Sequence, residues 1–419
     1  MNAPEINISF IEKANKSFQI ANRGIVALMI GAKPIDNLSN PFTVVTEADI
    51  PESGLSDTEV DQIKLALKGY EGTSPAKVIV YCMDKPVQYT ETYLNTLTLD
   101  QLKAIETEYG YTVPSGDTLS THIQNILTKQ VTKIAPAYEA ALAAMFNVKF
   151  NYIVFTTLAN DASVATLAST IIDWIDERGE SFRSKVILHG TANSYNNEHV
   201  IVNYSGATVA ETVSQGGVDT VVETEYTNDQ FCARIAGLLA ATPVERSATY
   251  AVIEEAVACT TPDDLDAAVD DGLFFLMFDG EKVKVCRAVN SFTTTTETKG
   301  ESFKKIRIVD IMDTIYNDIR GLTEDQYIGK YPNTYDNKNI LITSIDEYLN
   351  ELTRHNMING HTVEIDVNAQ REYLKEAGKP VEEMAENEIK EANTGSKVFL
   401  TGTINILDAI EDIDWTIYI

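Results

Sequence analysis

The side chains that most often carry catalysis are widely separated in this sequence. Asp161, His189 and Ser205 are the residue types of a hydrolytic triad, in which a carboxylate orients a histidine that activates a serine. Scattered trios of this kind occur in any chain of 419 residues. No GxSxG turn presents a serine, and neither GxGxxG nor GxxxxGK[ST] is present to hold a phosphate. We therefore predict that the protein is not an enzyme, with a cytosolic α/β enzyme of unknown substrate as the alternative.

The sequence gives equally little support for a metal site or for a catalytic thiol. His189 and His199 flank a possible turn and could form a metal pair, but no cluster of Cys, Asp or Glu completes a ligand set. The cysteines are far apart, without a CxxC pair: Cys82, Cys232, Cys259 and Cys286. Such spacing is typical of reduced core residues. We predict no metal and no cofactor.

Composition limits the partners of the chain. A length of 419 residues with 44% hydrophobic side chains predicts two or three domains. The net charge of -29 disfavours binding to nucleic acid or to anionic lipid, because both repel an acidic surface. The first residues do not form a signal peptide, and no apolar run is long enough to span a bilayer. We expect a cytosolic protein without membrane insertion.

The middle of the chain has the order of a parallel sheet. Apolar runs at 24–30 and 77–82 predict buried strands, with a helix at 56–70 between them. Residues 90–150 are helical in pattern. Strands at 152–156 and 185–189 enclose a helix at 164–177, which is the unit that builds parallel sheets. A strand at 199–204 and a helix at 228–241 follow, so the predicted fold class is α/β.

The C-terminal third predicts a hairpin followed by long helices. Asp279 and Gly280 form a tight-turn signal between apolar strands at 273–278 and 282–287. Helices are predicted at 303–320 and 336–357, strands at 362–367 and 397–406, and an acidic helical stretch at 369–392. These elements could form a second core.

Both ends of the chain alternate apolar and polar residues as a half-buried strand does. At the C-terminus these residues are Ile413, Trp415, Ile417 and Ile419. At the N-terminus they are Ile6, Ile8 and Phe10. An apolar strand with a free edge is a template for another chain. We therefore expect assembly by exchanged strands.

The order of these segments resembles the tail sheath proteins of contractile phages and R-type bacteriocins, especially their Gram-positive branch. The resemblance rests on short segments at 23–27, 271–278, 283–287, 292–294, 303–319 and 327–333. None of them is a catalytic signature. A different self-assembling shell or surface-layer protein is a further alternative, although the missing signal peptide disfavours export.

The resemblance implies an α+β core domain with a small augmented sheet, plus an inserted α/β domain. It divides the chain into an N-terminal linking arm (1–22), an N-terminal part of the body (23–90), an α/β outer domain (91–260), a tube-facing C-terminal core (261–408) and a C-terminal linking arm (409–419). The terminal strands of neighbouring subunits would join the hairpin through Phe275, Met277, Val283 and Val285.

The resemblance also implies the partners. Subunits would form stacked hexameric rings around an inner tail tube protein, bounded by baseplate and tail terminator proteins. The tube-facing residues would be Lys304, Lys305, Arg307 and Arg320. Assembly would take place in the cytoplasm of the bacterial host, and lysis would release the phage virion or bacteriocin particle.

Overall fold

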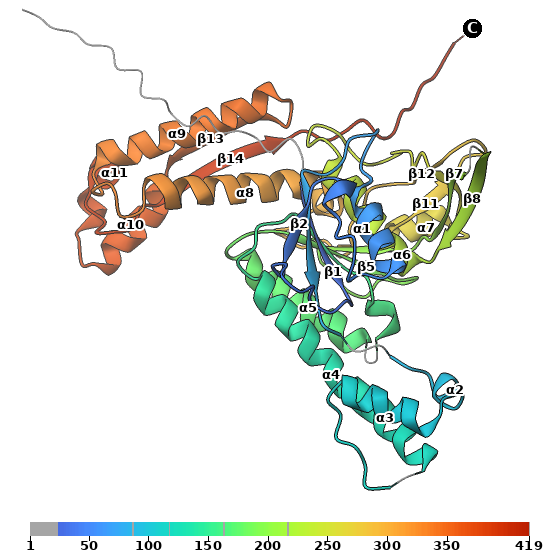
Figure 1. Ribbon diagram of the computed structural model, residues 1–419. Coiled ribbons are helices and arrows are strands. Elements are labelled where there is room, and N and C mark those ends of the chain that lie inside the picture. The colour runs from blue at the N-terminus through green and yellow to red at the C-terminus, as the bar shows by residue number, and fades with distance from the viewer. Residues whose placement is uncertain (1–23, 86–87, 117, 162–163, 216–217, 419) are drawn as a thin grey trace, which may run out of the picture.

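A seven-stranded sheet forms the centre of the molecule (Figure 1). The computed structural model describes residues 24–85, 88–116, 118–161, 164–215 and 218–418. The strand order is β10-β6-β5-β4-β1-β3-β2, and all neighbours are parallel except β2 and β3. The strands are β1 (Ile25–Ile30), β2 (Phe42–Val44), β3 (Lys77–Cys82), β4 (Tyr152–Phe155), β5 (Lys185–His189), β6 (Val200–Asn203) and β10 (Leu273–Phe274). The α/β prediction is confirmed.

Helices cover both faces of this sheet, because its strands carry apolar side chains on both sides. The covering helices are α1 (Asp57–Leu67), α4 (Leu119–Met145), α5 (Val164–Gly179) and α6 (Asn228–Ala241). Along β1, Val26 and Leu28 pack in the core beneath α1 and α6. Ala27 and Met29 pack in the core beneath α4 and α5. The predicted strand, helix and strand between residues 152 and 189 are β4, α5 and β5.

The sheet crosses the expected domain boundary at residue 90. Strands β1 and β3 lie before this boundary and β4 lies after it, yet β1 pairs with both β3 and β4. The expected N-terminal part of the body and the expected outer domain thus share one core. A division at residue 90 would cut through that core, and local sequence patterns do not reveal such long-range pairing.

A helical projection extends from the sheet (Figure 1). It consists of α2 (Glu91–Leu94), α3 (Leu99–Glu108) and the first half of α4. Its own small core contains Leu94, Leu102 and Ile126. The projection therefore folds around apolar contacts of its own, separate from those of the sheet.

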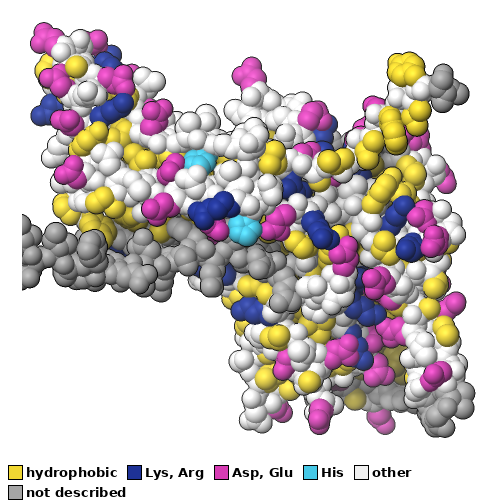
Figure 2. All heavy atoms as spheres, turned by 90° about the horizontal axis from the view of Figure 1, so that it is seen from above, with side chains coloured by type: hydrophobic (Ala, Val, Ile, Leu, Met, Phe, Trp, Pro, Cys, Tyr) yellow, Lys and Arg dark blue, Asp and Glu magenta, His cyan; other side chains and the backbone are white. Residues whose placement is uncertain are grey.

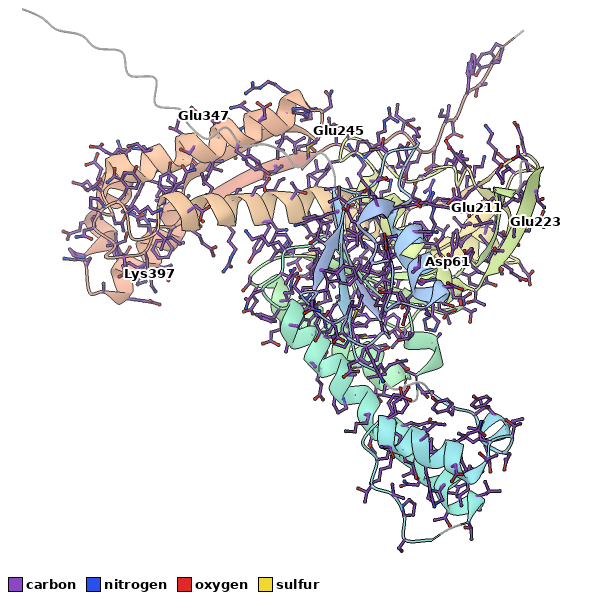
Figure 3. The ribbon with its side chains drawn as sticks, in the orientation of Figure 1. Asp61, Glu211, Glu223, Glu245, Glu347 and Lys397 are labelled. Atoms are coloured by element: carbon purple, nitrogen blue, oxygen red, sulfur yellow. The ribbon has the colours of Figure 1, made fainter. Side chains whose placement is uncertain are left out.

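A three-stranded sheet was missed by the sequence patterns. It has the order β8-β7-β9, with β7 (Ala207–Gln215), β8 (Val218–Tyr226) and β9 (Ala256–Cys259). Strands β7 and β8 form a ribbon whose outer half, where Figure 3 labels Glu211 and Glu223, is exposed. Polar side chains occupy both faces of this ribbon, so the alternation that predicts a half-buried strand is absent.

The predicted hairpin is present, but its first strand is shorter than expected. Strand β11 (Leu276–Phe278) pairs with β12 (Val283–Val285) around Asp279 and Gly280. The expectation of one strand over residues 273–278 is wrong, because β10 joins the central sheet instead. The hydroxyl of Ser205 accepts the N–H of Leu276 at 2.8 Å, where the chain passes from one sheet to the other.

The last third of the chain forms a lobe that extends away from the central sheet (Figure 1). Its elements are α8 (Ile306–Gln326), α9 (Tyr335–Arg354), β13 (Ile358–Ile365), α10 (Val367–Glu376), α11 (Glu386–Glu391) and β14 (Leu400–Ile406). Ile311 and Ile315 of α8 pack against Ile345 and Leu349 of α9. The acidic stretch at 369–392 covers a small core of its own around Leu374 and Ile389.

A buried polar cluster joins α8 to the central sheet. Lys185 begins β5, and its ammonium group donates to Asp313 and lies 2.8 Å from Asp310. Tyr152, at the start of β4, donates to Asp310 at 2.7 Å. The ring of His199 lies 3.0 Å from Asp313. Because α8 continues into the lobe, this cluster fixes the lobe to the body.

The pKa values of the two carboxyl groups in the cluster shift in opposite directions. Burial raises the pKa of Asp310 above its usual value, despite the nearby charge of Lys185. Burial would also raise the pKa of Asp313, but Lys185 and the hydrogen bond from His199 outweigh it and lower the pKa to about 2. Asp313 is therefore the carboxylate that the folded state stabilises in its charged form.

The Asp313→Asn variant tests this cluster by its pH dependence. A folded pKa of about 2 against an ordinary 3.8 makes the charge of Asp313 worth about 2 kcal/mol of folding stability at pH 7. A group whose pKa is lowered by folding stabilises the folded state at pH values above its unfolded pKa. The stability advantage of the wild type over the variant should therefore shrink as the pH falls from about 4 toward 2. Urea unfolding of both proteins between pH 7 and 3 measures this difference in the free energy of unfolding. A difference in stability that does not depend on pH would contradict this assignment.

Candidate functional site

The C-terminal segment, residues 407–418, leaves the lobe after β14 without helix or strand. Its large apolar side chains are exposed: Ile410 by 87%, Ile413 by 81%, Trp415 by 81% and Ile417 by 65%. Figure 2 shows hydrophobic side chains standing out along this segment. Isolated hydrophobic residues are common on surfaces, but a continuous row of this kind marks a site of interaction.

The expected strand at the C-terminus is absent from the described part of that segment, so this prediction is wrong for the single subunit. A strand requires backbone partners, and residues 411–418 have none in a sheet. Ile419 lies outside the described residues, as do Ile6, Ile8 and Phe10 of the expected N-terminal arm.

The first half of the C-terminal segment is held by polar contacts. The carboxylate of Glu411 accepts from Ser247 at 2.9 Å, from Thr249 at 2.7 Å and from Lys305 at 3.0 Å. Lys305 also donates to Asp408. Burial alone would lower the pKa of Lys305, but the hydrogen bonds to Asp408 and Glu411 outweigh it and raise the pKa. Lys305 is therefore held in its charged form.

Two arginines complete these contacts. Arg307 is 5% exposed, and its guanidinium group donates to the carbonyls of Leu407 and Glu245. Arg287 pairs with Asp412. Figure 3 labels Glu245 at the junction between the body and the lobe. The C-terminal segment therefore starts from a fixed point on the body.

The residues expected to face a tube have different surroundings. Lys304 pairs with its neighbour Glu301 at 2.8 Å, and Arg320 pairs with Glu324 at 2.8 Å. Lys305 and Arg307 contact the C-terminal segment instead. Sequence reasoning missed Ser247, Thr249 and Glu411, which complete the site around Lys305. The sequence signal for this pairing was the presence of an acidic run at 408–412 and a basic run at 304–307.

The hairpin expected to receive exchanged strands is largely enclosed within its own subunit. Phe275, Val283 and Val285 are fully buried, and Met277 is half-buried. The segment before β9 already pairs with β12, since Ile253 donates to the carbonyl of Val283 at 2.9 Å. The outer edge of β12 is therefore occupied.

Strands β13 and β14 offer a different edge. They form a two-stranded sheet that no other described strand joins. One side packs on the lobe core through Ile358, Val363 and Ile406. The other side is polar and exposed, with Thr362 and Thr403 in contact at 2.8 Å. A pair of strands with open edges can accept further strands.

The residues considered for catalysis do not form a triad. Ser205 donates its hydroxyl proton to the carbonyl of Thr260, and Asp161 accepts from Gln88 and Tyr138. Burial lowers the pKa of His189. Within the described ranges, no three His, Cys, Asp or Glu side chains gather as metal ligands would.

The thiols are not activated. All four cysteines are free, and burial raises the pKa of each, to about 11 for Cys82. A raised pKa keeps the sulfur protonated and weakly nucleophilic. Among the helices of the described residues, none combines the length and the apolar composition that a bilayer crossing requires.

Comparison with known proteins decides the family. Residues 132–291 match the phage tail sheath protein central domain, and residues 298–419 match the phage tail sheath C-terminal domain. A tail sheath protein of Clostridium phage phiCD119 is 31% identical over 372 residues, which cover 86% of this chain and 98% of the relative. The chain belongs to the phage tail sheath family.

Solved structures show the same fold. The sheath tail protein of Listeria innocua has a TM-score of 0.59 at 16% identity, covering 94% of this chain and 97% of its own. The contracted helical sheath of the anti-feeding prophage has a TM-score of 0.55 at 12% identity, covering 100% and 99%. This sheath subunit is a structural protein and a component of a phage tail, and its family implies a non-enzymatic role. The sequence-based resemblance is confirmed.

The two tryptophans of the sheath subunit test the exposure of its C-terminal segment. Trp174 is 8% exposed, whereas Trp415 is 81% exposed. In dilute solution, Trp174→Phe should leave an emission spectrum close to that of free tryptophan, strongly quenched by iodide. Trp415→Phe should leave a blue-shifted, protected emission. Protection of Trp415 in the dilute subunit would contradict the exposed arrangement.

Proposed function

We propose that this sheath subunit assembles into stacked hexameric rings around an inner tail tube, and that contraction of the sheath drives the tube through a target cell envelope. Family membership and the exposed apolar row of the C-terminal segment support this proposal. The row lies beyond a fixed point and has no partner in the described subunit. A second copy is the partner that a helical assembly supplies most directly.

Terminal strands link the subunits in this proposal. Residues 1–22 and 409–419 are the linking arms, and each adds a strand to a sheet of a neighbouring subunit. Main-chain pairing would hold the joint while the subunits move as nearly rigid bodies. In this scheme the sheath assembles in a high-energy extended state, and new contacts between outer domains favour the contracted state.

The β13–β14 sheet is the better supported receiver of these arms. Its strands are eight and seven residues long, and no third strand of the described residues pairs with them. The β11–β12 hairpin, which the sequence suggested, has three-residue strands and an occupied outer edge on β12. A longer open edge provides more backbone hydrogen bonds for an added strand.

The proposed partners are the tube protein, the baseplate and the tail terminator, and no reaction is catalysed. Assembly takes place in the host cytoplasm, and the product is a phage tail or an R-type bacteriocin. Lys304 and Arg320 remain the candidates for the tube contact, because their ion pairs are partly exposed and such pairs are weak.

Negative-stain electron microscopy of the purified protein tests assembly. At high concentration the wild type should form hollow helical tubes. A variant lacking residues 413–419 should remain a folded, soluble subunit, because the described side chains of this range, 413–418, are exposed. Normal polymers from this variant would rule out the exchange of C-terminal arms. Small closed oligomers from the wild type, without any tubes, would contradict the proposed helical assembly.

The tube contact is tested by co-expression with the tube protein of the same tail. Lys304→Glu with Arg320→Glu should reduce the number of tubes covered by extended sheath, because the variant places acids where cations are proposed to bind an acidic tube. Free polymers of the variant should still form. Lys375→Glu with Lys379→Glu makes the same change of charge on α10 and beyond it, and serves as the control. Equal coverage with both variants would exclude Lys304 and Arg320 from the tube contact.

A further inference from the structure

We propose that Glu411, Lys305, Ser247, Thr249 and Arg307 form a root clamp that sets the position and direction in which the C-terminal segment leaves the subunit. The proposal rests on the exchange of C-terminal arms proposed above and adds the device that makes the exchange productive. The residues of the clamp act by positioning the arm, and they do not pair with the neighbouring subunit themselves.

The first observation is a buried carboxylate within an exposed segment. The side chain of Glu411 is 5% exposed, although it lies on a segment that is otherwise open to solvent. Two residues later Ile413 is 81% exposed, and Trp415 has the same value. A buried carboxylate is costly unless its oxygens are paired. The contacts of Glu411 are therefore specific, and beyond Asp412 every described side chain of the segment is exposed.

The second observation is that the clamp joins three distant parts of the sequence. Ser247 and Thr249 lie on the loop after α6, Lys305 immediately precedes α8, and Glu411 follows β14. Arg307 of α8 links the other two parts by donating to the carbonyl of Glu245, on the loop after α6, and to the carbonyl of Leu407, after β14. The N–H of Leu407 in turn donates to the carbonyl of Met357 at 3.0 Å. The base of the segment is thus attached to the body and to the lobe together.

The third observation concerns the described part of the C-terminal segment that extends beyond its contacts with the body. Among the described residues, the contacts of the segment with the body end at Asp412, which pairs with Arg287. The side chains that follow carry the apolar alternation of a strand, with Ile413, Trp415 and Ile417 on one face. The clamp therefore separates an anchoring part, 407–412, from a pairing part, 413–418.

Fixing the base of the C-terminal segment favours strand exchange because less conformational entropy is then lost on pairing. Ordering each backbone residue costs conformational entropy, and the clamp orders residues 407–412 before the partner arrives. The pairing part then reaches a neighbour from a defined point, which raises its effective concentration at the receiving sheet. Without the clamp, the joint would have to order the whole segment and would transmit less force.

The Glu411→Ala variant tests the clamp in the full-length protein. We expect the protein concentration needed for polymerisation to rise by about tenfold or more, which corresponds to a loss of roughly 1.4 kcal/mol per joint. Hydrogen exchange should show faster exchange of the Leu407 amide, while the melting temperature changes little. Glu411→Gln keeps an acceptor oxygen for Ser247 and Thr249, so it should recover part of the assembly.

The matched control is Glu386→Ala, which breaks an exposed ion pair with Lys390 at the far end of the lobe and should polymerise as the wild type does. Wild-type assembly of Glu411→Ala, together with failure of the variant that lacks residues 413–419, would overturn the clamp and leave arm exchange intact. Normal assembly of the truncated variant would overturn arm exchange itself. If Glu411→Ala does not fold, Ser247→Ala removes one donor from the clamp and must show the same direction of change.

Discussion

The buried ion cluster at the base of α8 is the interaction on which the rest of the molecule depends. Lys185 at the start of β5 holds Asp310 and Asp313, one helical turn apart, against the amino ends of the parallel strands. A buried charge is tolerated only with a partner, so this helix cannot slide or rotate without leaving carboxylates unpaired. The position of α8 relative to the sheet is thereby set.

The fixed position of α8 also determines the positions of the segments next to its two ends. Lys305 immediately before α8 and Arg307 in its first turn hold the start of the C-terminal segment. Farther along, Ile315 and Leu322 of α8 pack in the lobe core, which α9 and the β13–β14 sheet complete; this sheet is the proposed receiver of arms from other subunits. One rigid helix therefore relates the place from which an arm leaves to the place at which an arm is received. Such a fixed relation lets subunits turn as units during contraction while their joints persist.

Much of the core followed from sequence pattern. Apolar runs such as 77–82 predicted buried strands, and the Asp279-Gly280 turn predicted the hairpin, because both signals are local. The β7–β8 ribbon was missed, since strands that are polar on both faces lack periodicity. Lys305 and Arg307 were recognised as notable cations, but the residues they contact in the C-terminal segment lie at least 100 residues farther along the chain. A tube was therefore assigned in place of the C-terminal segment.

The sequence by itself determined the fold class, the family and the apolar alternation at the C-terminus, because each depends on neighbours along the chain or on the order of elements. Tertiary structure alone decided that β1, β3 and β4 share one sheet across the expected domain boundary. It also decided that the C-terminal residues are not a strand in the single subunit, since a strand exists only where another backbone satisfies its hydrogen bonds. The pairing of Glu411 with Lys305, Ser247 and Thr249 belongs to the same class: burial and charge are properties of the assembled core, and no local pattern encodes them.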